Sequence, residues 1–260
     1  MNGRETALVT GASLGIGKEL AKLFAADGRD LVLVARSEDK LQSLAQELEG
    51  AHGIRAHVVP ADLSDPGAPA AIFAALEGKE IQLDYLVNNA GFGASGPFAE
   101  LPLQLQRDMV QVNVDALVAL THLALQGMLA RGKGRVLNIA STAGFQPGPG
   151  MAIYYATKAF VLTFSEGIAE EVRASGVTVT AHCPGATLTN FGDTAGNAKS
   201  ILFKIGAAPA DKVALHAYRS MMKGKVVAIE GLMNWIGAFS VRFGPRALVR
   251  KITRWMNKTS

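Results

Sequence analysis

The stretch Thr10-Gly11-Ala12-Ser13-Leu14-Gly15-Ile16-Gly17 follows the first short apolar run of the chain and leads into an amphipathic segment of helix length. Three glycines between a strand and a helix let the backbone turn sharply and approach a pyrophosphate closely. The helix N-terminus then offers free N–H groups and the positive end of its dipole to the phosphates. The spacing differs from the commoner G-x-G-x-x-G, and a glycine-rich turn without a ligand is the alternative. The stretch predicts a dinucleotide site.

Short apolar runs alternate with amphipathic segments along the whole chain. The runs predicted as strands are residues 6–10, 31–35, 57–61, 85–88, 135–140, 177–183 and 226–229. The segments predicted as helices are residues 16–26, 39–49, 67–77, 103–130, 153–174 and 209–222. Continuous runs of Val, Leu and Ile are typical of strands covered on both faces. The pattern predicts an α/β fold: a single Rossmann-type doubly wound domain with a seven-stranded parallel sheet flanked by helices on both faces.

The composition fits one folded unit. Of 260 residues, 49% are hydrophobic and only 18% are charged, which argues against disorder and for extensive burial. We expect residues 1–230 to form one dinucleotide-binding domain, and residues 231–260 to form a C-terminal extension of that domain. The single Cys183 excludes an internal disulfide, and the histidines lack metal-ligand spacing, so no metal site is predicted. We expect a cytoplasmic protein, with peripheral membrane association as an alternative.

The end of the second predicted strand bears on the choice of cofactor. It reads Ala35-Arg36-Ser37 and carries no acidic residue. Dinucleotide folds commonly place a carboxylate there for the ribose hydroxyls of NAD, whereas an arginine accommodates a 2′-phosphate. A guanidinium binds phosphate strongly and with defined geometry. Arg36 therefore predicts NADP(H) in preference to NAD(H), the alternative being a solvated arginine.

Tyr154 and Lys158 lie four residues apart in a predicted helix, so their side chains share one face. A tyrosine has a pKa near ~10 and transfers protons poorly at neutral pH unless that pKa is lowered. An ammonium group about 5 Å away contributes roughly 3 kcal/mol at an effective dielectric constant of ~20, which predicts a pKa lowered by about 2 units. Ser141 follows a predicted strand, where open α/β sheets bind ligands. Tyr155 has no lysine four residues later, so Tyr154 and not Tyr155 is the candidate for proton transfer.

Together these motifs resemble the short-chain dehydrogenase/reductase family over essentially the whole chain. The matching residues are Thr10–Gly17, Ala61-Asp62-Leu63, Asn88-Asn89-Ala90-Gly91, Asn113, Ser141, Tyr154, Lys158 and Pro184-Gly185-Ala186-Thr187-Leu188-Thr189. The resemblance implies a catalytic tetrad of Asn113, Ser141, Tyr154 and Lys158. Tyr154 would be the general acid in reduction and the base in oxidation, and Ser141 would hydrogen-bond the substrate oxygen. Lys158 would bind the nicotinamide ribose and lower the pKa of the tyrosine, and Asn113 would hold a water in the proton relay.

The resemblance also implies a set of cofactor contacts. They are Gly11, Ser13, Leu14, Gly15, Ile16, Gly17, Arg36, Asp62, Leu63, Asn89, Ala90, Gly91, Tyr154, Lys158, Pro184, Gly185, Thr187 and Thr189. The implied activity is NADP(H)-dependent interconversion of a ketone or aldehyde with an alcohol, on a lipophilic or acyl-type substrate. A catalytically silent NADP(H)-binding sensor or scaffold is the alternative, and an intact tetrad argues against it.

The walls of the substrate pocket are expected from residues 93–101 and 144–151 and from the segment 186–208, which lacks periodicity and is predicted to be a long loop. Six side chains suggest an apolar pocket: Phe145, Met151, Phe191, Ile201, Leu202 and Phe203.

The predicted helix 153–174 is apolar on nearly every side, which, together with the resemblance, predicts a homodimer or homotetramer.

The positive charge of the chain is concentrated at its C-terminal end. The last thirty residues carry six cations and no acid. Since the whole chain carries a net charge of +4, the first 230 residues carry −2, and a nucleic-acid-binding surface is not expected. After Pro245, one helical arc carries Leu248, Val249, Ile252, Trp255 and Met256, and the opposite arc carries Arg246, Arg250, Lys251, Arg254 and Lys258. We expect the apolar arc to pack on the protein; peripheral membrane contact through residues 245–258 is the alternative.

Overall fold

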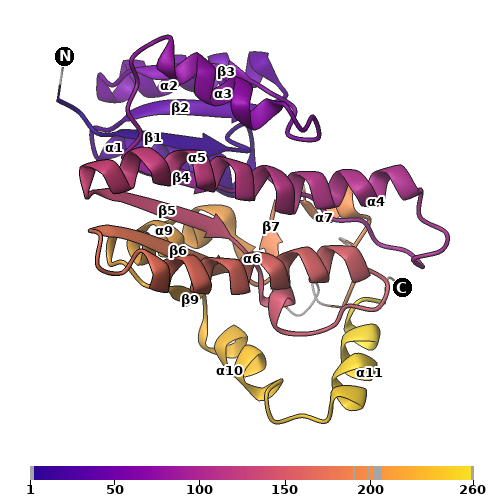
Figure 1. Ribbon diagram of the computed structural model, residues 1–260. Helices are drawn as coiled ribbons and strands as arrows, with labels where there is room; N and C mark the ends of the chain where they lie inside the picture. The colour runs from indigo at the N-terminus through magenta and orange to yellow at the C-terminus, as the bar shows by residue number, and fades with distance from the viewer. Residues whose placement is uncertain (1–2, 190, 198–199, 202–205, 259–260) are drawn as a thin grey trace.

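The computed structural model describes residues 3–189, 191–197, 200–201 and 206–258 (Figure 1). Its centre is a seven-stranded parallel sheet with the strand order β3-β2-β1-β4-β5-β6-β9. The strands are β1 (Thr6–Thr10), β2 (Asp30–Ala35), β3 (Ala56–Pro60), β4 (Tyr85–Asn88), β5 (Gly134–Ile139), β6 (Val177–Cys183) and β9 (Val227–Ile229). The predicted fold class is confirmed.

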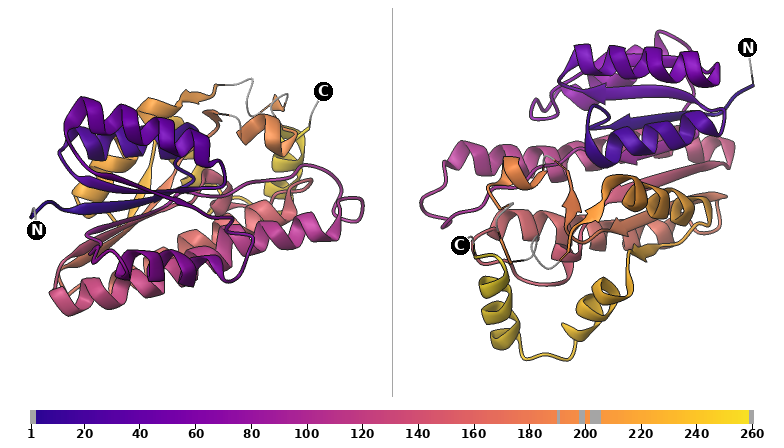
Figure 2. Two further views of the ribbon diagram at one scale, coloured as in Figure 1. Left: turned by 90° about the horizontal axis from the view of Figure 1, so that it is seen from above. Right: turned by 180° about the vertical axis from the view of Figure 1, so that it is seen from behind.

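Helices cover both faces of the sheet (Figure 2). One face carries α1 (Gly15–Ala26), α2 (Glu38–His52) and α9 (Ala210–Met222). The other face carries α3 (Ala68–Glu77), α5 (Ala116–Arg131) and α6 (Ala152–Glu171). Successive side chains of β1 go to opposite faces: Val9 belongs to the core under α1, and Leu8 to the core under α3 and α5. Burial on both faces is why the strands read as continuous apolar runs.

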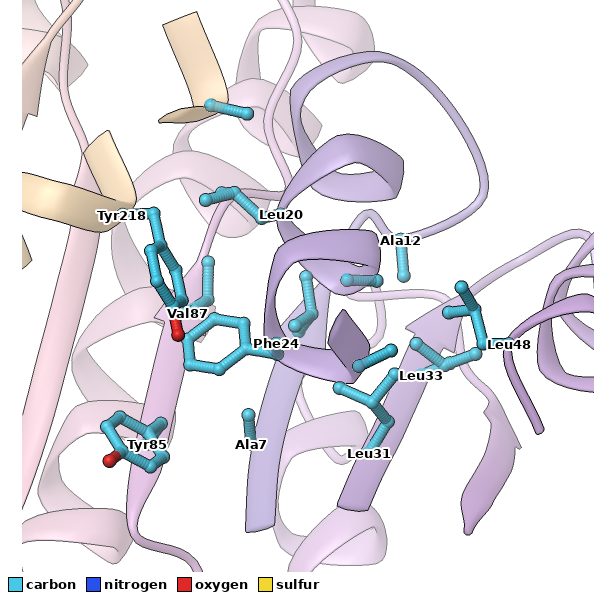
Figure 3. Packing of buried hydrophobic residues seen from close by; sticks show 14 of the residues in the cluster. Ala7, Ala12, Leu20, Phe24, Leu31, Leu33, Leu48, Tyr85, Val87 and Tyr218 are labelled. Atoms are coloured by element: carbon cyan, nitrogen blue, oxygen red, sulfur yellow. The ribbon is translucent and has the colours of Figure 1, made fainter. Parts of the chain in front are cut away.

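Phe24 of α1 lies in the packing between α1, α9 and the sheet (Figure 3). Its ring centroid is 4.9 Å from that of Tyr218 at an interplanar angle of 82°, and 5.3 Å from that of Tyr85. Aromatic pairs of this kind contribute about 0.5–1.5 kcal/mol beyond their buried area. The aromatic cluster therefore fixes α1, whose N-terminus carries the glycine-rich turn.

The long helical segment predicted over 103–130 is interrupted. It consists of α4 (Leu103–Val110), a π-helical turn η1 (Gln111–Asp115) and α5. Within the described residues, Leu103–Arg131 is the one helix long and apolar enough, by length and composition, to cross a membrane. Its Leu117, Leu120 and Met128 are nevertheless buried in the two cores against the sheet, as in a core helix of a globular domain.

The segment predicted as a long loop contains short regular elements. Strand β7 (Thr187–Leu188) pairs with β8 (Ala208–Pro209), and helix α7 (Phe191–Ala195) lies between them in the chain. Ala195 is buried in a small cluster with Met151 and Tyr155, and Phe191 packs against this cluster. These elements are stabilised by tertiary contacts. Because such contacts leave no periodic pattern in the sequence, the sequence did not indicate them.

The C-terminal extension forms two helices, α10 (Leu232–Ser240) and α11 (Arg246–Met256), that project from the body as a V (Figures 1 and 2). The helix after Pro245 was predicted, whereas α10 was not. The expectation that the apolar arc of α11 packs on the protein is only partly met. Met256 lines a cavity of the body, but Leu248, Ile252 and Trp255 are about half exposed.

Candidate active site

A cavity of about 310 Å³ opens at the carboxyl ends of β1, β4 and β5. This edge includes the point where β1 pairs with β2 on one side and with β4 on the other, which is the usual ligand crevice of an open α/β sheet. The predicted cofactor contacts that line it are Gly11, Leu14, Gly15, Ile16, Arg36, Asn89, Ala90, Gly91, Tyr154, Lys158, Pro184, Gly185, Thr187 and Thr189. Ser141 lines it as well.

Five predicted site residues are not among those that line the cavity: Ser13, Gly17, Asp62, Leu63 and Asn113. Each of the last four has a local role in the described structure. Leu63 is buried in the core under α3, and the Asp62 carboxylate accepts hydrogen bonds from the backbone N–H and hydroxyl of Ser64. These bonds, the backbone one first, lower the pKa of Asp62.

The glycine-rich turn has a geometry that other residues do not adopt without strain. Gly11 and Gly15 have φ angles of +64° and +56°. A Cβ atom on Gly17 would lie 2.3 Å from the Gly11 carbonyl oxygen, so the third glycine permits the tight packing of helix on turn. Within the described chain, no side chain caps the start of α1 at Leu14. The first N–H groups of α1 are thus available to an anion, and the turn fits a pyrophosphate.

Thr10 is a residue that the sequence motif contained but whose role was not predicted. Its Oγ1 atom accepts hydrogen bonds from the backbone N–H groups of Asn89 and Ala90, both at 3.0 Å, and donates one to the Val87 carbonyl oxygen at 3.1 Å. Asn89 also donates from Nδ2 to the Thr10 carbonyl oxygen at 2.9 Å. These bonds tie the loop after β4 to the glycine-rich turn, so the two segments form one continuous wall of the cavity.

Asn113 lies in the π-helical turn η1 and is buried behind the wall of the cavity. Its Oδ1 atom accepts from the Phe92 backbone N–H at 3.0 Å, while Nδ2 donates to the Phe92 carbonyl oxygen at 2.9 Å and to Thr157 Oγ1 at 3.1 Å. A Cβ atom on Gly91 would lie 3.0 Å from Asn113 Oδ1 and 3.6 Å from Lys158 Nζ. The Asn113 amide therefore clamps the loop after β4 to α6. Single π-turns of this kind are frequent at functional sites.

Tyr154 and Lys158 project from α6 toward Ser141, which follows β5. The Ser141 hydroxyl oxygen accepts from the Ala143 N–H at 3.1 Å and so caps the short 3₁₀ helix η2 (Thr142–Phe145). Lys158 Nζ donates to the Ile139 carbonyl oxygen at 2.7 Å and lies 5.9 Å from the centroid of the Tyr154 ring. A hydroxyl, a phenol and an ammonium group thus share one cavity.

Burial has the largest effect on the pKa values of Tyr154 and Lys158. It raises the pKa of Tyr154 above the ordinary tyrosine value, and a hydrogen bond with Ser141 opposes the rise. It also lowers the pKa of Lys158 to about 8. The expected lowering of the Tyr154 pKa by Lys158 is therefore wrong for this arrangement. The reason is that both groups are desolvated and the ammonium donates to a backbone carbonyl, so its charge does not offset the burial of the phenol.

Tyr155, the tyrosine without a lysine partner, has a different role. Its hydroxyl donates a 2.9 Å hydrogen bond to Oδ1 of Asn257, and Asn257 Nδ2 donates to the Pro149 carbonyl oxygen at 3.1 Å. Tyr155 and Asn257 are 102 positions apart in the sequence, and neither stands in a motif that would have linked them. Only the fold could reveal this contact.

Beside Tyr154 the cavity is lined by several apolar side chains. Phe191 packs on Tyr154 with ring centroids 5.2 Å apart, and Met151 and Met256 also line the space. Met256 was not among the six predicted pocket residues. Phe145 lies instead on a neighbouring cavity, while Leu202 and Phe203 lie outside the described residues.

Comparison with known proteins gives consistent results. The family model for short chain dehydrogenase matches residues 5–200. The chain is 40% identical over 183 residues to a very-long-chain 3-oxoacyl-CoA reductase of Anas platyrhynchos, an alignment that covers 68% of this chain and 58% of that relative. The chain therefore spans little more than half of that relative's length. It is also 35% identical over 185 residues to a 7beta-hydroxysteroid dehydrogenase of Collinsella aerofaciens, with 71% and 70% of the two chains covered.

Among solved structures, a short-chain dehydrogenase from Sphingobium yanoikuyae in complex with NADPH superposes with a TM-score of 0.83 at 34% identity. That superposition covers 95% of this chain and 97% of the other. Because the uncovered 5% is smaller than the C-terminal extension, the superposition includes part of that extension.

Proposed function

Because the chain belongs to the short-chain dehydrogenase family, we propose that it is an NADP(H)-dependent oxidoreductase that interconverts a ketone or aldehyde with an alcohol. The observation that carries this proposal is the shared cavity. The glycine-rich turn forms one part of its wall, and Ser141, Tyr154 and Lys158 form another. In this proposal residues 1–230 are the cofactor-binding and catalytic unit, and residues 231–260 extend it.

In the direction of reduction, bound NADPH supplies the hydride that adds to the carbonyl carbon. The Tyr154 hydroxyl donates its proton to the carbonyl oxygen, and its raised pKa keeps that proton in place at neutral pH. The Ser141 hydroxyl hydrogen-bonds the same oxygen and orients it. Lys158 holds the nicotinamide ribose and Asn113 supports the relay that returns a proton from solvent to Tyr154. One carbonyl, one NADPH and one proton give one alcohol and one NADP⁺.

The preference for NADP(H) over NAD(H) is supported by Arg36. This residue directly follows β2, is exposed, and lines the cavity. The strand end reads Ala35-Arg36-Ser37 and so carries a cation and no acidic residue, which suits a 2′-phosphate. The structurally similar dehydrogenase in complex with NADPH agrees with this choice.

A lipophilic or acyl-type substrate is supported by the apolar side of the cavity, formed by Met151, Phe191 and Met256. The two relatives described above are named for substrates of two shapes, a long flexible acyl chain and a rigid fused ring. A panel that contains 3-oxoacyl thioesters of several lengths and fused-ring ketones would separate these shapes.

The test is NADPH oxidation with that panel, together with the Tyr154→Phe variant. We expect turnover with at least one lipophilic ketone, and a kcat reduced by about 10²–10⁴-fold in the variant while NADPH binding is retained. Tight NADPH binding without turnover on any carbonyl compound would favour the silent sensor. Turnover that is unchanged in Tyr154→Phe would contradict the assigned acid.

Assembly as a homodimer or homotetramer is also part of the proposal. Exposed apolar side chains on the long helix 103–131 and on α6 support it, namely Leu103, Val110, Leu129 and Phe160. Sedimentation at micromolar concentration tests it, and a monomer would contradict it.

The exposed strip of α11 favours a second type of partner, an anionic membrane surface. Leu248, Ile252 and Trp255 lie beside the arc of cations on this helix, an arrangement that suits the lipid interface. In this proposal the protein is cytoplasmic with peripheral contact through residues 245–258. Co-sedimentation with anionic liposomes should retain the full chain and lose a chain that ends at Gly244; equal retention of the two would contradict membrane contact through this helix.

A further inference from the structure

We propose that Tyr155 and Asn257 form a latch that holds the end of α11 against the substrate pocket, so that the C-terminal extension limits the length of the substrate. The latch is the hydrogen bond between the Tyr155 hydroxyl and Asn257 Oδ1, together with the bond from Asn257 Nδ2 to the Pro149 carbonyl oxygen. The effect on substrate length rests on the proposed oxidoreductase function, whereas the latch itself does not.

The chemistry of the three groups fixes the direction of both bonds. The Pro149 carbonyl oxygen can only accept, so the Asn257 amide must present Nδ2 to it. Oδ1 then faces the Tyr155 hydroxyl, which donates. Both Tyr155 and Asn257 are buried, at 5% and 8% exposure, so water does not replace a lost partner easily. The amide is thus matched to its two partners in one orientation.

The latch is the main polar attachment of α11. In the described part of the chain, two side-chain hydrogen bonds join residues 245–258 to the rest of the protein: Asn257 accepts one from Tyr155 and donates the other to Pro149. Leu248, Ile252 and Trp255 of this helix are about half exposed and so contribute only part of their apolar surface to packing on the body. The position of the end of α11 therefore depends on Asn257.

That position matters to the pocket because Met256 precedes Asn257 and lines the same cavity as Tyr154. Tyr155 lines this cavity and also the neighbouring one, which Phe145, Val241 and Val249 help to form between the body and the C-terminal helices. The latched residues thus stand between the substrate pocket and a second, largely apolar space. When the latch is open, a chain too long for the first cavity can extend into the second.

The substrate test compares kcat/KM for a long and a short 3-oxoacyl thioester. We expect Met256→Ala to raise the long-to-short ratio by about 10-fold or more, the order of effect that removal of a methylene from an apolar pocket has on selectivity. Asn257→Ala and Tyr155→Phe should raise the ratio in the same direction. Because Asn257→Ala already removes the bond, Tyr155→Phe should add little in that background. Ile252→Ala, on the exposed strip of α11, is the matched control and should leave the ratio within about 2-fold of the parent.

A second measurement does not depend on turnover. Amide hydrogen exchange of residues 246–258 should be faster in Asn257→Ala than in the parent and in Ile252→Ala, with NADPH binding as the check that each variant is folded. Faster exchange in a protein inactive on every carbonyl would support the latch and contradict the proposed activity. Unchanged exchange, or fully additive effects of the Tyr155 and Asn257 variants on the ratio, would overturn the latch and leave the proposed activity standing.

Discussion

Lys158 Nζ lies 5.9 Å from the centroid of the Tyr154 ring, but its hydrogen bond goes to the Ile139 carbonyl oxygen at 2.7 Å. The ammonium group is therefore held by the end of β5 rather than by the phenol. Burial lowers the pKa of Lys158 to about 8 and raises that of Tyr154. In this arrangement it is the lysine, and not the tyrosine, that titrates just above neutral pH.

The pH dependence of carbonyl reduction follows from these two directions. Tyr154 stays protonated across the neutral range, while Lys158 is charged below about pH 8 and loses its charge above it. We expect kcat/KM for reduction, measured at saturating NADPH, to fall as the pH rises through about 8. A profile that stays flat up to pH 10 would show that the charge on Lys158 is not needed.

Replacement of Arg36 should weaken NADPH binding selectively. Arg36→Leu removes the cation that faces the expected 2′-phosphate, and we expect the Kd for NADPH to rise by about tenfold or more while that for NADH changes little. Lys40→Leu, an exposed cation in the first turn of α2, is the control for a general loss of positive charge. Equal weakening of NADPH and NADH binding in Arg36→Leu would contradict a 2′-phosphate contact.

The third glycine of the turn should not tolerate even alanine. In Gly17→Ala the new Cβ atom would lie 2.3 Å from the Gly11 carbonyl oxygen and 2.4 Å from Asn89 Nδ2, so the two cofactor loops must separate. We expect the free energy of unfolding to fall by about 1–3 kcal/mol and NADPH binding to weaken. Urea unfolding and cofactor titration measure the two effects.

Gly50→Ala is the matched control. Gly50 lies within α2, and in the described structure a Cβ atom there meets nothing within 4 Å. This substitution should stabilise the helix by about 0.5–1 kcal/mol. If Gly17→Ala and Gly50→Ala changed the free energy of unfolding and NADPH binding in the same way, the close packing at Gly17 would not be the cause of the expected losses.

Acid should destabilise the fold through His182. This side chain is fully buried, its Nε2 atom lies 3.0 Å from His216 Nδ1, and burial lowers its pKa to about 3. The unfolded chain binds a proton near pH 6.5 and the folded protein does not, so stability is lost as the pH falls below about 6.5, by up to about 1.4 kcal/mol per pH unit. Urea unfolding at several pH values should give a flatter dependence for His182→Gln than for the parent.

The exposed His52 serves as the comparison for that measurement. His52→Gln should keep the pH dependence of the parent. If His182→Gln and the parent showed the same dependence, the buried histidine would not be the group responsible.

Much of the sheet, and the part of the cavity wall formed by the glycine-rich turn, could be predicted because the sequence patterns that specify them are local. Strands buried on both faces give continuous apolar runs, and the turn from Thr10 to Gly17 carries its own geometric requirements. The pairing of Tyr154 with Lys158 followed from helical spacing alone.

The remainder depends on contacts distant in sequence. Strand β7 is two residues long and gains its partner β8 only in the folded chain. Tyr155 meets Asn257 because the C-terminal extension returns to the first turn of α6, and no local pattern encodes that return. The direction of the Tyr154 pKa depends on burial by several elements, which a pairwise spacing argument does not include.

The π-helical turn at Asn113 interrupts a long helix that is otherwise regular. On either side of the turn, α-helical geometry allows the helix to pack on the sheet. Within the turn, the change of geometry lets the Asn113 amide reach Phe92 and Thr157. Selection of this chain for heat resistance alone would favour changes that restore an unbroken helix there. Such variants would gain stability and lose the Asn113 hydrogen bonds to Phe92 and Thr157, so a gain in stability at this turn would be expected to reduce activity.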